Sequence, residues 1–185
     1  MKVRRYCKRQ RKPAACGQAL FRVSLSFAAG AAAAVFAFIK YDFNCTWLSD
    51  CLNNGSVPAV FASCVLLDLA ALLASTSILG DVLVPFTSFA AGVAVALQSA
   101  SIISAGVGVI SRKMLFSVLI PSAITLPPFF IVACHGILFS RLVESCQDIR
   151  VRRNAAARLA VYGAFSCIMA FAAAEYICRL LPVII

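Results

Sequence analysis

Long apolar runs separated by short polar or basic segments dominate the chain. The two clearest runs cover 82–110 and 114–140. Gln98 is the only charged, amide or imidazole side chain in the first run, and His135 is the only one in the second. At about 1.5 Å per residue, each run is long enough to cross about 30 Å of hydrocarbon as a helix. We therefore predict that both runs are transmembrane helices.

Three further runs have the same character and complete a predicted bundle of five spans. The predicted spans are 19–39, 57–79, 82–110, 114–140 and 159–181. The segment 1–18 is a basic N-terminal tail, and 19–185 forms a single transmembrane domain. The predicted fold is all-α: a multi-pass integral membrane helix bundle.

Three prolines set the fourth span apart from the others. They are Pro121, Pro127 and Pro128. Each proline removes a backbone donor and kinks a helix, which a membrane tolerates where neighbouring helices cover the freed carbonyl groups. We expect the fourth span to be kinked, broken and buried among the other helices.

The third span carries a small residue at every fourth position. The stripe consists of Ser88, Gly92, Ala96, Ala100, Ser104 and Gly108. Such a stripe lets the backbone of another helix approach closely, which favours a packing surface. Because nearly half of this run is Gly, Ala or Ser, the same register also arises readily by chance. The sequence therefore leaves open whether the protein forms a homo-oligomer.

The basic residues lie in two clusters and set the predicted orientation. The chain has 17 Lys and Arg against 7 acids, and 62% of its residues are hydrophobic. Seven basic residues lie in 1–13 and five arginines lie in 141–158, four spans apart. The positive-inside rule accounts for both clusters better than nucleic-acid binding does, and it places the N-terminus inside and the C-terminus outside. We expect 141–158 to form a helix lying along the inner leaflet.

Asp68 lies at the centre of the second predicted span. A carboxylate there costs about 2.5–3.5 kcal/mol on insertion scales, so we expect a protonated side chain that faces the bundle. One interpretation is structural, a hydrogen bond to Gln98 or to a serine of the third span. The other is functional, with Asp68 carrying protons or ions. Both stay open on the sequence.

The remaining chemistry-bearing residues predict no metal, no cofactor and no enzymatic activity. The nine cysteines contain no C-x-x-C pair and there is one histidine, so a zinc site is not expected. Phosphate-binding loops and serine or metalloprotease motifs do not occur. Cys45 and Cys51 form either a local disulfide in the outer loop or two free thiols. A pair between Glu175 and Arg179 is expected near the outer end of the fifth span.

Several short motifs between the second and fourth spans occur in a fixed order. They are Ile78-Leu79-Gly80, Pro85, Gly92, Val118-Leu119-Ile120-Pro121, Pro128 and Ser140-Arg141. With these motifs and its five-span plan, the sequence resembles the stage II sporulation protein M family of small multi-pass membrane proteins.

The resemblance implies a non-enzymatic scaffold in the membrane that engulfs the forespore. It further implies peptidoglycan-remodelling partners, namely the stage II sporulation proteins D and P. The alternative is a permease-like transporter subunit, with Asp68 and Gln98 lining a path and 141–158 coupled to an ATPase. Membrane lipids are partners under either hypothesis, and nucleic acid is not.

Overall fold

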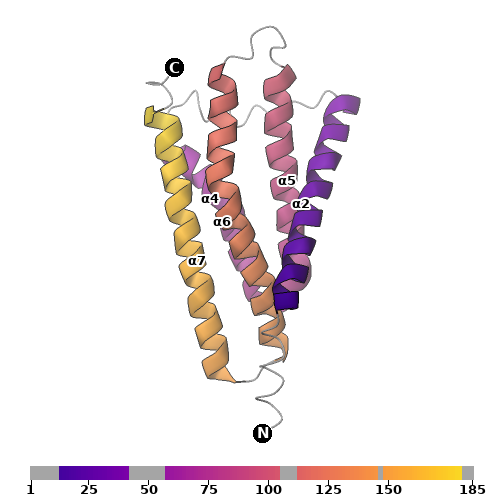
Figure 1. Ribbon diagram of the computed structural model, residues 1–185, viewed down its shortest axis with the longest axis vertical. Helices are drawn as coiled ribbons and strands as arrows, with labels where there is room; N and C mark the ends of the chain where they lie inside the picture. The colour runs from indigo at the N-terminus through magenta and orange to yellow at the C-terminus, as the bar shows by residue number, and fades with distance from the viewer. Residues whose placement is uncertain (1–12, 42–56, 105–111, 146–147, 181–185) are drawn as a thin grey trace.

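The computed structural model describes residues 13–41, 57–104, 112–145 and 148–180, and these residues are almost entirely helical (Figure 1). The helices are α2 (Pro13–Tyr41), α4 (Val57–Thr76), α5 (Gly80–Ser104), α6 (Arg112–Ser145) and α7 (Ile149–Glu175), followed by the π-helical turn η1 (Tyr176–Leu180). Within the described ranges no strand occurs. The predicted all-α fold is confirmed.

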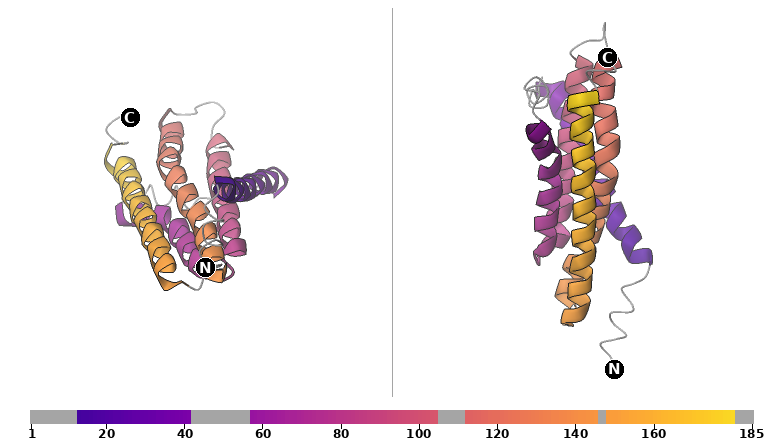
Figure 2. Two further views of the ribbon diagram at one scale, coloured as in Figure 1. Left: turned by 60° about the horizontal axis from the view of Figure 1, so that its bottom comes forward. Right: turned by 90° about the vertical axis from the view of Figure 1, so that its left-hand side faces the viewer.

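The helices run alternately up and down. In Figure 1, α7, α6, α5 and α2 lie side by side across the front, and α4 lies behind them. The start of α2, the α4–α5 turn and the α6–α7 turn lie toward one end of the bundle (Figures 1 and 2). One basic cluster precedes α2, and the other surrounds the junction of α6 and α7. The start of α2 and the start of α7 therefore lie at the same end of the bundle.

Four of the described helices have the length and apolar composition needed to cross a membrane. They are Ala15–Tyr41, Gly80–Leu97, Ile120–Ser145 and Ile149–Glu175. In α4, the segment Val65–Thr76 is a shorter apolar helix. Large apolar side chains such as Phe21, Leu73 and Phe36 point outward and are more than 60% exposed. An outward apolar surface of this kind suits lipid, so the chain is a multi-pass membrane protein.

α6 passes through its three prolines without a break. Its axis bends part-way along (Figure 1), so the predicted kink is present while the predicted interruption is wrong. Pro121 and Pro128 are buried, whereas Pro127 is exposed. Buried Val132 and Ile137 belong to the core further along the same helix. Neighbouring helices thus cover α6, and this packing stabilises a helix that proline alone disfavours.

The predicted surface helix at 141–158 is wrong. α6 continues to Ser145, and α7 begins at Ile149 and runs directly into the fifth span. Asp148 caps α7, because its Oδ1 accepts a hydrogen bond from the Arg150 backbone N–H at 3.0 Å. The amphipathic spacing of this segment therefore reflects the ends of two packed helices and not one helix on a leaflet.

Glycines bring α2 and α5 into close backbone contact. A Cβ atom on Gly30 would overlap the Phe89 carbonyl oxygen and lie 2.9 Å from its carbon. A Cβ atom on Gly92 would likewise overlap the Phe27 carbonyl oxygen. Real Cβ atoms do not come this close to backbone, so only glycine permits this approach.

The small-residue stripe of α5 lies partly in this contact. Ser88 and Ala96 are buried, and Ala96 packs in one cluster with Ala34 of α2. Ala100 is partly exposed. The side chains of Gln98 and Ser104, and the whole of Gly108, fall outside the described residues.

Candidate functional site

A buried contact between two polar side chains joins α4 to α7. Asp68 is 3% exposed and Ser166 is 1% exposed. The Ser166 hydroxyl donates a hydrogen bond to Asp68 Oδ2 at 2.5 Å. One turn before Ser166, a Cβ atom on Gly163 would lie 2.8 Å from Leu72 Cδ1, so the helices are close at this level. The carboxyl group is therefore held between two helices by a short polar contact.

This pairing corrects the partner expected from the sequence. The prediction placed the partner of Asp68 on the third span, at Gln98 or a serine, whereas the structure supplies it from the fifth span. Ser166 lies within an apolar run and is separated from Asp68 by 98 residues. No local sequence pattern therefore identified it as the partner of Asp68. One face of α7 carries small, buried residues at helical spacing, namely Gly163, Ser166 and Ala170. This pattern indicates a helix-packing face and is the sequence signal that could have pointed to Ser166.

A second polar cluster joins three helices at the end of the bundle that holds the α4–α5 turn. Arg141 of α6 lies against Asp81 of α5, with Nε 2.9 Å from Oδ1 and one terminal nitrogen 2.8 Å from the same oxygen. Arg22 of α2 reaches Asp81 Oδ2 through Nη1 at 3.1 Å. Arg22 and Asp81 are 59 residues apart in the sequence, and the fold brings them together. The carboxylate of Asp81 thus bridges two arginines.

The start of α5 is also fastened by the end of α6. The Ser140 hydroxyl, 1% exposed, lies 3.0 Å from the Ser77 carbonyl oxygen and 3.3 Å from that of Ile78. A Cβ atom on Gly80 would lie 2.8 Å from Ser140 Cβ. Gly80 and Ser140 thus fit the α4–α5 turn tightly onto α6. Both belong to the motifs that carry the family resemblance.

His135 takes part in packing between α6 and α7. Its ring stacks on Tyr162, with centroids 4.3 Å apart and planes 20° apart.

At the far end of α7, Glu175 and Arg179 form the predicted ion pair, with Arg179 Nε 2.6 Å from Glu175 Oε2. That prediction is confirmed.

Several of the described polar groups join neighbouring helices. Within the described ranges, no three His, Cys, Asp or Glu side chains gather as metal ligands. In the same ranges every buried side-chain nitrogen or oxygen has a hydrogen-bond partner. Cys45 and Cys51 lie outside the described residues. No protein-family model, curated protein or solved structure matches this chain.

Proposed function

We propose that this protein is a non-enzymatic membrane scaffold that anchors peptidoglycan-remodelling proteins at the cell membrane during forespore engulfment. The observation that carries the proposal is the pairing of polar side chains between spans. The Asp68–Ser166 contact fastens α4 to α7, and Asp81 fastens α5 to α2 and α6 through Arg22 and Arg141. These contacts favour a fixed arrangement of helices, which is what a platform for other proteins requires.

The burial of Asp68 supports a scaffold over a transporter. A carboxyl group that carries protons or ions needs access to water on at least one side. Asp68 is 3% exposed and its Oδ2 already accepts a hydrogen bond from Ser166. Its role as a bond between helices accounts for both observations.

The resemblance supplies the class of partner. The Gly80–Ser140 contact joins two of the resembling motifs in space, so these residues support one another structurally. If the resemblance extends to function, the partners are membrane-associated peptidoglycan hydrolases, of which stage II sporulation proteins D and P are the expected examples. Peptidoglycan lies outside the membrane, so these partners would meet the outer loops and outer helix ends.

Affinity purification from sporulating cells tests the proposed function. We expect the full-length protein to recover peptidoglycan hydrolases, and an unrelated multi-pass protein of the same membrane serves as the control. Stoichiometric recovery of an ATPase without any hydrolase would replace the scaffold with the transporter subunit.

The proposed orientation places the N-terminus and the α6–α7 turn in the cytoplasm. The two basic clusters support it through the positive-inside rule. Membrane-impermeant thiol labelling of intact cells should modify Cys45 or Cys51, after reduction where needed, and should leave Cys7 and Cys146 unlabelled. Labelling of Cys146 from outside would reverse the orientation.

A further inference from the structure

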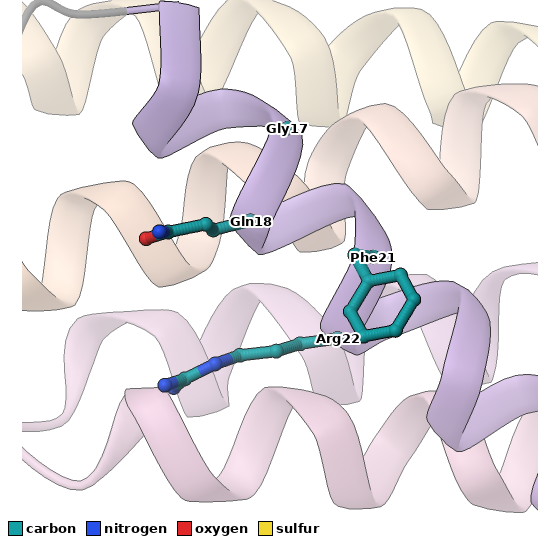
Figure 3. Close-up of a pocket in the computed structure, with 4 residues that line it drawn as sticks. All are labelled: Gly17, Gln18, Phe21 and Arg22. Atoms are coloured by element: carbon teal, nitrogen blue, oxygen red, sulfur yellow. The ribbon is translucent and has the colours of Figure 1, made fainter.

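An open hollow lies on α2 beside the Asp81 cluster. It is lined by Gly17, Gln18, Phe21 and Arg22 (Figure 3). Gly17 carries no side chain, and nothing lies within 4 Å of the place where its Cβ would be. The side chains of Gln18 and Arg22, one helical turn apart, extend from α2 in the same direction (Figure 3). Their nitrogen donors therefore reach the same side of the hollow.

The ion-pair cluster beside the hollow, which shares Arg22 with it, carries an excess of positive charge. The carboxylate of Asp81 is shared between Arg22 and Arg141, so the cluster has two cations and one anion. Arg141 is the closer and less exposed of the two, with 25% of its side chain exposed against 52% for Arg22. Arg22 donates to Asp81 only through Nη1, which leaves its other guanidinium donors available among the described contacts.

The surroundings of the hollow are apolar. Phe21 is 66% exposed, precedes Arg22 in α2 and belongs to the stretch Ala15–Tyr41, which is long and apolar enough to span a membrane. Arg22 lies near the end of the bundle at which α2 begins, so its guanidinium is within reach of the headgroup layer. A ligand that fits this combination has an anionic group for Arg22 and Gln18 and an apolar chain for Phe21.

We propose that this hollow binds the phosphate headgroup of an anionic phospholipid. The phosphate accepts hydrogen bonds from the free guanidinium donors of Arg22 and from the amide nitrogen of Gln18. An acyl chain lies along Phe21. The site would add a lipid-specific contact at the point where α2 meets α5 and α6.

Native mass spectrometry of the full-length protein in detergent tests the proposal. Phosphatidylglycerol is titrated, and phosphatidylcholine is the control lipid. We expect tighter binding of phosphatidylglycerol, weakened about fivefold by Arg22→Gln and to a similar extent by Gln18→Ala. Gln18→Ala leaves both ion pairs of Asp81 intact, so its effect does not depend on a loosened fold.

Arg153→Gln is the matched control. Arg153 is exposed on α7 near the same end of the bundle but does not line the hollow, so its removal should leave the affinity unchanged. Equal binding of the two lipids would overturn the proposal, as would unchanged phosphatidylglycerol affinity in both Gln18→Ala and Arg22→Gln. Displacement of the lipid by millimolar inorganic phosphate would assign the hollow to free phosphate instead.

Discussion

Replacing Gly30 by alanine should separate α2 from α5. The added Cβ would overlap the Phe89 carbonyl oxygen and would lie 2.9 Å from its carbon, where ordinary contact begins at about 3.4 Å. The obstructing atoms are helix backbone and cannot rotate aside. The two helices must therefore move apart by at least about 0.5 Å along the contact, which also loosens the reciprocal packing of Gly92 on Phe27.

The size of the effect follows from the cost of overpacking. Insertion of a methyl group into a tightly packed contact typically costs about 1–3 kcal/mol. For a chain of 185 residues, this corresponds to a fall in Tm of about 2–12 °C. Thermal unfolding of the purified protein in a mild detergent, followed by circular dichroism, measures the change.

Gly17 provides a matched control on the same helix. Nothing lies within 4 Å of the place that an added methyl group would occupy, so Gly17→Ala should leave the Tm unchanged or raise it slightly, since alanine favours helix over glycine. Comparable Tm values for Gly30→Ala and Gly17→Ala would refute the close α2–α5 contact.

Two further predictions concern the polar contacts. Ser166→Ala and Asp68→Leu should each weaken the association of α4 with α7 by about 0.6–2 kcal/mol in the same unfolding assay, whereas Asp68→Asn should preserve both stability and complementation of a null strain. A normally abundant but inactive Asp68→Asn variant would instead assign proton or ion movement to this residue. Asp81→Asn should lower stability by about 1 kcal/mol or less, because its ion pairs with Arg22 and Arg141 are partly exposed. The loss of stability caused by Asp81→Asn should be smaller in 1 M NaCl, because salt screens the ion pairs. A loss of stability that does not depend on salt would contradict ion pairing by Asp81.

The lengths of the apolar runs were sufficient to predict the helices. Lipid leaves a spanning segment no alternative to internal backbone hydrogen bonding, so apolar length alone predicts a helix. Helical spacing was misleading at 141–158, where the recurring apolar residues were interpreted as one surface helix. The turn at Asp148 divides this segment, and a single cap residue between two helical patterns is a weak signal.

The partners of the polar residues could not be predicted from the sequence. In a bundle of similar apolar helices, composition does not determine which faces meet, because most faces are compatible with lipid and with one another. Asp68 was recognised as unusual, but its partner Ser166 depends on α7 lying against α4. Likewise, Arg22 and Asp81 meet across a separation of 59 residues, and no local pattern connects them.

The separation of Asp68 from Ser166 also has a consequence for biosynthesis. Asp68 lies on α4, the second of the five described α-helices, and its hydrogen-bond partner is synthesised 98 residues later. At about 5–20 residues per second, the carboxyl group waits roughly 5–20 seconds for that partner. A chain that ends before α7, or whose α7 fails to insert, keeps an unsatisfied carboxyl group within the membrane. Asp68 is therefore paired with Ser166 only in chains that extend through α7.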